Sequence, residues 1–157
     1  MGANPRTKGA EGEREVIRML TPIVKEVLSE MNFPEEDVKA ADEMIQRNQN
    51  QSAVGGNDLS NTFGMSIEVK RQEQLSINTW WNQCVEAAKR NDEIPVLIYR
   101  QNRKPWRVRT LGFLHTPEHG GSWSSHNCVV EIDKDTFLVW FKLWVKGKIL
   151  NGWEIRV

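Results

Sequence analysis

Two carboxylates and a lysine stand close together around the β-prone stretch MSIEVKR in the first half of the chain. Side chains alternate faces along a strand, so Glu68 and Lys70 share one face while Ile67 and Val69 share the other. Asp58 precedes this stretch on a short segment that is predicted to pair with it as a hairpin. Two carboxylates at the ends of neighbouring strands form an oxygen-rich site that suits Mg²⁺ or Mn²⁺.

A divalent ion at such a site can activate water as a nucleophile and stabilise the charge on a phosphate, and an adjacent lysine can orient that water. The same residues allow a purely structural interpretation. Glu68 and Lys70 can be an exposed pair on an edge strand that contributes only a fraction of a kcal/mol. The tripeptide ExK is common, so the catalytic interpretation depends on Asp58 and on the N-terminal residues described below.

Composition and charge limit the other possibilities. The chain has 157 residues and is 39% hydrophobic, which predicts a single domain. Its formal net charge is zero, so the protein as a whole has no positive field that would attract nucleic acid. The charge is locally uneven, because residues 95–117 contain five Arg or Lys and no acid. This basic segment is either a phosphate-contact surface, with Trp106 available for packing or stacking, or an ordinary solvated turn.

The cysteine content and the hydrophobic pattern indicate the compartment. Cys84 and Cys128 are the two cysteines, and their wide separation favours reduced thiols in a cytoplasmic protein. The N-terminal residues lack an apolar core, and no stretch approaches the ~20 apolar residues of a membrane span. We therefore expect a cytoplasmic protein without a membrane partner.

Hydrophobic periodicity predicts a mixed α/β order of elements. A helix begins near Glu11, and Pro22 makes it either one kinked helix or two stacked segments. A helix is also expected over 33–48, and another after the MSIEVKR strand, capped by Ser76 or Asn78. The predicted elements that follow are a buried strand IPVLIYR, a turn QNRKP, a strand WRVRTLGF, a Gly/Ser/His loop, a strand CVVEI and a last helix from about residue 133.

That last helix is apolar around nearly its whole circumference, which requires burial on several sides. A homodimer interface that includes Trp140 and Trp144 is one outcome, and completion of the monomer core is the other. In the preceding loop, His115, His119, His126 and Cys128 could be drawn as a zinc set. Their spacing matches no familiar zinc finger, and an ordinary loop is the simpler interpretation.

Four segments in the correct order resemble the archaeal-type Holliday junction resolvases of the PD-(D/E)xK nuclease superfamily. They read KGAEGERE, GGND, IEVK and PVLIYRQNRKPWRV. The resemblance implies a single nuclease domain over 1–157 with a restriction-endonuclease-like core, in which helices flank a central mixed β-sheet. The chain departs from the pattern at Asn57, where a proline is usual, in an extra helical segment at about 32–51, and in a C-terminal extension at about 113–157.

The resemblance also implies roles for individual residues. Asp58 and Glu68 would be the principal metal ligands, with the Val69 carbonyl as a third, and Lys70 would handle the nucleophilic water. Glu13 would reach the metal from the first helix, although an acid in the first turn of a helix is also favourable without any catalytic role. The residues expected to contact DNA are Lys8, Arg14, Arg71, Arg103, Lys104 and Arg107.

The expected function is therefore that of a Mg²⁺- or Mn²⁺-dependent endonuclease on branched DNA, most simply a homodimeric Holliday junction resolvase in DNA recombination and repair. A repair- or restriction-type nuclease of the same fold is an alternative. A non-catalytic DNA-binding module is another, but such a module would be expected to have lost part of the set Glu13, Asp58, Glu68 and Lys70.

Overall fold

A mixed β-sheet forms the centre of the computed structural model, which describes residues 5–48 and 57–155. Within those residues the main sheet has four strands in the order β3-β4-β5-β6, and β3 pairs parallel with β4 while the other pairs are antiparallel. This arrangement confirms the predicted α/β class with a central mixed sheet. The strands are β3 (Met65–Gln72), β4 (Ile94–Gln101), β5 (Arg107–Pro117) and β6 (Trp123–Asp133).

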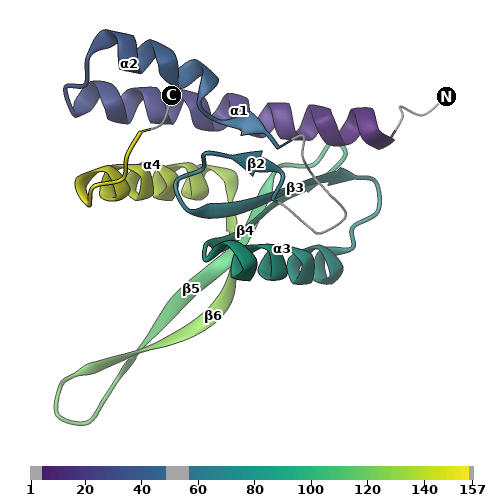
Figure 1. The fold of residues 1–157 in the computed structure, drawn as a ribbon. Coiled ribbons are helices and arrows are strands. Elements are labelled where there is room, and N and C mark those ends of the chain that lie inside the picture. Colours follow the sequence, from purple (N-terminus) through teal and green to yellow (C-terminus); the bar gives the residue numbers. More distant parts are fainter. Residues whose placement is uncertain (1–4, 49–56, 156–157) are drawn as a thin grey trace.

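Helices cover both faces of this sheet. The helices α1 (Pro5–Glu30) and α4 (Lys134–Leu150) lie on one face, and α3 (Ile77–Asn91) lies on the other (Figure 1). The alternation of β4 explains the two layers, because Val96 and Ile98 belong to the larger core while Leu97 and Tyr99 pack with Trp80 of α3. The buried run IPVLIYR is thus apolar on both faces, as a central strand requires.

Helix α1 is one continuous helix, which settles the question raised by Pro22. Pro22 lies exposed within it, while Val16, Leu20, Val24 and Val27 form a fully buried stripe. The apolar spacing of three to four residues therefore predicted a helix here, and of the two alternatives left open at Pro22 the single helix is correct. The helix begins at Pro5, earlier than the start expected near Glu11.

The segment after α1 differs from its prediction. A helix was expected over 33–48, but α2 (Glu35–Ala40) and a 3₁₀ turn, η1 (Ala41–Glu43), end earlier. The chain then forms β1 (Gln46–Arg47), which pairs antiparallel with β2 (Leu59–Ser60). The backbone of residues 46 and 47 forms its hydrogen bonds with β2 instead of continuing the helix. This pairing joins residues that are distant in the sequence, so local periodicity could not predict it.

The predicted Gly/Ser/His loop is largely β-strand, so that prediction was wrong. β5 and β6 pair as far as Pro117 and Trp123, and the Glu118 N–H donates to the Ser122 carbonyl across the turn (2.8 Å). Gly120 and Gly121 have φ of +88° and +84°, so the glycines serve only the turn. Their presence made a longer stretch resemble a loop.

Helix α4 is anchored in the core by Phe137, Phe141 and Val145. Trp140 and Trp144 are half-buried and pack against the same core, so this helix completes the monomer core on one side. It leaves exposed apolar side chains on its other side, among them Leu143. Among the described residues, no helix combines the length and the apolar character needed to cross a membrane.

Candidate active site

The free edge of β3 carries the first part of the site. The Asp58 N–H donates to the Ile67 carbonyl (2.9 Å), and Asp58 Oδ2 accepts a hydrogen bond from the Val69 N–H (2.7 Å). The Asp58 carboxylate therefore occupies the place that a carbonyl of a further strand would take. This pairing sets Asp58 beside Glu68, which lies between Ile67 and Val69 on β3.

The acids of the site are buried and repel one another. Glu13, Asp58 and Glu68 are all buried. Burial raises the pKa of Glu68 to about 8, and the negative charge of Asp58 adds to the rise, with a smaller contribution from Glu13. The ammonium of Lys70 opposes this pKa shift. The structure thus brings Glu13, Asp58, Glu68 and Lys70 into one electrostatically coupled group.

Glu13 reaches this group from α1 and has a partner that the sequence did not indicate. Arg47 of β1 donates from Nε to Glu13 Oε2 at 2.5 Å, with the carboxylate almost fully buried. β1 is placed by its pairing with β2, which directly follows Asp58. Arg47 lies in a polar stretch without apolar periodicity, so no local signal could have identified its role.

A second acid of α1, Glu15, fixes the helix to the sheet. Glu15 Oε1 accepts hydrogen bonds from Arg71 (2.7 Å) and Arg100 (3.0 Å), and Glu15 Oε2 accepts one from Trp106 Nε1 (3.2 Å). The Arg100 guanidinium also lies over the Trp106 ring, 5.1 Å from its centroid. Glu15 thereby ties α1 to β3, β4 and the start of β5. Trp106 is buried. Arg71, which was expected to contact DNA, is only partly exposed and is ion-paired with Glu15.

The predicted basic surface divides into free and paired cations. Arg103 and Lys104 are exposed in the turn between β4 and β5, and no side-chain partner holds either of them within the described residues. Arg107 and Arg109 instead form ion pairs with Glu131 of β6, at 2.7 Å and 3.2 Å. The cations that are open to a phosphate are therefore those at the tip of the turn.

The other predicted DNA contacts lie on α1. Arg14 is exposed beside the buried Glu13, so its side chain is accessible from solvent. Lys8 is part of the α1 backbone, and its side chain falls outside what the structure describes.

The carboxylates of the site suit a hard divalent cation, although their side chains are not arranged in a complete coordination geometry. No group of three or more His, Cys, Asp or Glu side chains in the described ranges is disposed to hold a metal ion. Carboxylate oxygens are the ligands that Mg²⁺ and Mn²⁺ prefer. The pKa of Glu68 is raised first by burial and then by the charge of Asp58, and a nearby cation would favour the ionised carboxylate. The chemistry of Asp58 and Glu68 therefore fits such an ion.

The histidines considered for zinc lie on the β5–β6 hairpin. His115 Nδ1 is 3.0 Å from Ser125 Oγ, its cross-strand neighbour, and His126 is paired with Leu114. Within the described chain they form no metal-binding group.

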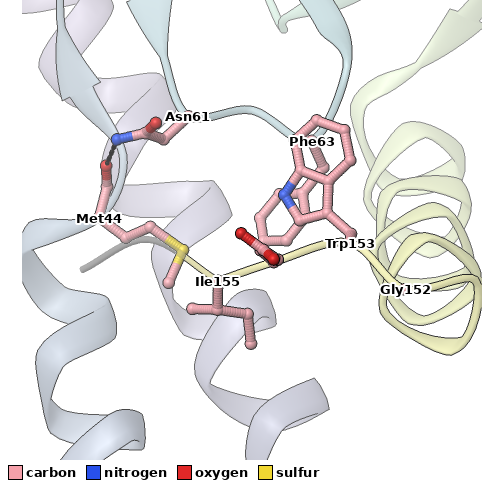
Figure 2. Close-up of a pocket in the computed structure, with 7 residues that line it drawn as sticks. Met44, Asn61, Phe63, Gly152, Trp153 and Ile155 are labelled. Carbon is pink, nitrogen blue, oxygen red and sulfur yellow. Dashed lines mark hydrogen bonds between the residues drawn. The ribbon is translucent and has the colours of Figure 1, made fainter.

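A separate pocket of about 480 Å³ lies under the C-terminal segment (Figure 2). Trp153 lies beside Phe63 with the ring centroids 6.0 Å apart, and Asn61 Nδ2 donates to the Met44 carbonyl. The residues that line this pocket are Met44, Asn61, Phe63, Gly152, Trp153, Glu154 and Ile155. The four candidate catalytic residues are not among these, so this pocket is distinct from the acidic site.

Comparison with known proteins identifies the class. A family model described as "Phage putative PDDEXK endonuclease" matches residues 4–112, and the chain therefore belongs to this family. This confirms the resemblance to the PD-(D/E)xK nucleases. Among solved structures, the Holliday junction resolvase of the archaeal hyperthermophile Archaeoglobus fulgidus is similar with a TM-score of 0.39 and 16% identity, over 84% of this chain and 88% of that chain. No curated protein matches the sequence.

Proposed function

We propose that this protein is a divalent-metal-dependent endonuclease that hydrolyses phosphodiester bonds in DNA, with its nuclease domain spanning residues 1–157. The observation that carries the proposal is the group of buried acids at the edge of β3, in which Asp58 helps to raise the pKa of Glu68 to about 8 beside Lys70. Buried like charges are costly in a stable fold. A bound cation that neutralises these carboxylates would explain why the fold buries them together. Membership of the PDDEXK endonuclease family agrees with this proposal.

The residues would divide the work as follows. Asp58 and Glu68 would hold Mg²⁺ or Mn²⁺, with the Val69 carbonyl as a further ligand and Glu13 acting directly or through water. When bound, the ion would lower the pKa of water and stabilise negative charge on the phosphate. Lys70 would orient the attacking water, and its ammonium would offset charge that develops in the transition state.

For the substrate, we propose branched DNA, with a four-way junction as the best candidate. The support is the ordered resemblance of KGAEGERE, GGND and IEVK to the junction resolvases. Resolution of a junction requires two symmetrically placed nicks, which one active site per chain supplies only as a homodimer. Such an enzyme would act in DNA recombination or repair in the cytoplasm. A repair- or restriction-type nuclease of the same fold is the second candidate.

Cleavage assays on defined DNA test both levels of this proposal. Four-way junction, flap, duplex and single-stranded DNA would be compared with Mg²⁺ and with a chelator. Preferential, chelator-sensitive cleavage of the junction is expected, and preferential cleavage of duplex or flap DNA would favour the second candidate.

Variants of the site test the chemistry itself. Glu68→Ala and Lys70→Ala should each lose at least ~100-fold in cleavage while still binding DNA. Glu86→Ala, which removes an exposed acid on α3, is the matched control and should cleave normally. Near-normal turnover by Glu68→Ala would contradict the assignment, and a wild type that binds DNA without cleaving any substrate would indicate a non-catalytic DNA-binding module.

A further inference from the structure

The outer part of the β5–β6 hairpin projects beyond the main sheet. The last β4–β5 pair joins Val96 to Thr110, so residues 111–129 form a ribbon with only two strands among the described residues (Figure 1). We refer to residues 111–129 as the hairpin arm. A two-stranded ribbon is marginally stable in water unless another layer covers it. The arm therefore lacks the support that α1, α3 and α4 give to the rest of the sheet.

The hairpin arm concentrates exposed apolar side chains. It holds five of the ten large hydrophobic residues that are exposed in the described chain. The register places most of them on one face, because Leu111 pairs with Val129 and Pro117 pairs with Trp123, while Phe113 lies between these pairs. We call this the apolar face of the arm: it presents Leu111, Phe113, Pro117, Trp123 and Val129, with His115, Ser125 and Asn127 between them.

The opposite face is different, because Val130, the residue that follows the arm, covers its base. A Cβ on Gly112 would lie 2.8 Å from Val130 Cγ1, so Val130 already fills the space above the glycine. Farther out, Leu114 is paired with His126. Leu114 is 58% exposed and its neighbour Phe113 is 62% exposed, so the two differ mainly in the face that they occupy.

The near absence of charge on the arm distinguishes between DNA and a protein surface as its binding partner. Residues 110–130 contain no Lys or Arg, and Glu118 is their one acid. A surface that binds nucleic acid uses cations to neutralise phosphates, so this arm is unsuited to DNA. Two copies of the same nearly neutral face can instead meet without like-charge repulsion.

We propose that a second copy of this chain docks on the apolar face of the hairpin arm, with the two arms related by a two-fold axis. Such an interface is self-complementary, since each apolar face meets its own equivalent. The family match covers residues 4–112, so nearly all of the arm lies outside the matched segment.

This inference rests on the homodimer included in the proposed function, and it locates the dimer surface on the arm instead of on α4. Each apolar face would supply the covering layer that the other arm lacks. The cores that carry the acidic sites would then remain free to contact DNA.

Sedimentation of matched variants tests the surface. Phe113→Asp and Trp123→Asp should each raise the dimer dissociation constant at least ~10-fold, because each places a charge inside the interface. Leu114→Asp adds the same charge to the neighbouring residue on the opposite face, and it should leave the dimer intact. All three residues are exposed in the monomer, so their melting temperatures measured below the dissociation constant should match that of the wild type.

A wild type that stays monomeric at high micromolar concentration would overturn the proposal. So would an equal effect of Phe113→Asp and Leu114→Asp on the dimer, or dissociation caused by Leu143→Asp on α4 but not by the arm variants. Loss of DNA binding by Phe113→Asp without any change in association would assign the arm to DNA instead, and would also overturn it. A DNA-nicking assay distinguishes failure of the dimer interface from failure of the proposed nuclease function. Monomeric arm variants should still make single nicks, whereas an inactive wild-type dimer would contradict the nuclease and leave the arm interface standing.

Discussion

The Asp58 carboxylate accepts a hydrogen bond from the Val69 N–H, and this bond joins a candidate catalytic acid to the backbone of the strand that carries the next one. Asp58 thus has a structural role that depends on its shape, and in the proposed mechanism it also has a chemical role that depends on its charge. An isosteric amide preserves the first role and removes the second.

Substitutions at Asp58 should separate the two roles. Asp58→Asn keeps an oxygen that can accept from Val69, so it should fold with wild-type stability or better and lose cleavage. Asp58→Ala leaves a buried N–H unpaired, which should lower the free energy of unfolding by about 1–3 kcal/mol in addition to the loss of cleavage. Denaturant unfolding in chelator checks this, and equal stability of the two variants would show that the hydrogen bond contributes little.

Glu68 should make the metal-free protein less stable as the pH rises. Its folded pKa of about 8 exceeds its ordinary value of 4.5, so between these values the folded state binds a proton that the unfolded state has released. Stability therefore falls across this window, by at most about 1.4 kcal/mol per pH unit. The stability of Glu68→Gln relative to the wild type should therefore increase between pH 5 and pH 8 in thermal melts with chelator. A difference that is independent of pH would contradict the assignment.

Removal of Arg47 should expose the cost of burying Glu13. Arg47→Met takes a cation from a nearly buried carboxylate and should lower the free energy of unfolding by about 1–3 kcal/mol, with partial recovery in Arg47→Lys. Lys25→Met breaks the more exposed pair with Asp42 and should cost about 0–1 kcal/mol. Chemical denaturation compares the three, and equal effects of Arg47→Met and Lys25→Met would show that the Glu13 pair is no more than a surface contact.

The free cations of the β4–β5 turn should contribute to DNA affinity. Neutralising Arg103 and Lys104 together should weaken binding and reduce the salt slope by about 0.9 for each duplex phosphate contact that is lost. Adding Arg107 to the set should change the slope less, because Glu131 already holds its guanidinium. Binding measured over a range of salt concentrations checks this. An unchanged slope in the double variant would remove the turn from the DNA interface.

The two thiols should differ in reactivity. Burial raises the pKa of Cys84 to about 12, and its side chain is inaccessible to solvent on the face of α3 that packs against the sheet. Cys128 is only partly buried on the hairpin arm. A thiol reagent at neutral pH should therefore modify Cys128 in the folded protein and Cys84 only after unfolding. Mass spectrometry of the labelled peptides reads this out, with rapid native labelling of Cys84 as the contrary result.

Local patterns predicted those parts of the structure that depend on near neighbours. The alternation in MSIEVKR placed Ile67 and Val69 in the core, and the apolar spacing of α1 survived Pro22. The approach of Glu13 to Glu68 was implied only by the family resemblance, because 55 positions separate them and periodicity has no access to that distance.

The features that escaped prediction are tertiary. Arg47 meets Glu13 only because β1 pairs with β2, and the three contacts of Glu15 join segments that lie up to 91 positions apart. The length of the hairpin was missed for another reason. The glycines at 120 and 121 and the surrounding serines are typical of loops, whereas the cross-strand pairing that extends β5 and β6 depends on both strands at once.

The position of Asp58 along β3 also bears on how readily the molecules aggregate. An edge strand of eight residues with unpaired N–H groups is a template for strand addition by another chain, and Asp58 occupies one of those groups with a charged side chain. In the proposed enzyme, this one side chain would therefore serve both the chemistry of the site and the protection of the sheet edge. For trapping a complex with uncleaved DNA, the inactive protein of choice is Asp58→Asn, since the alanine variant would open the edge at the concentrations that crystallisation requires.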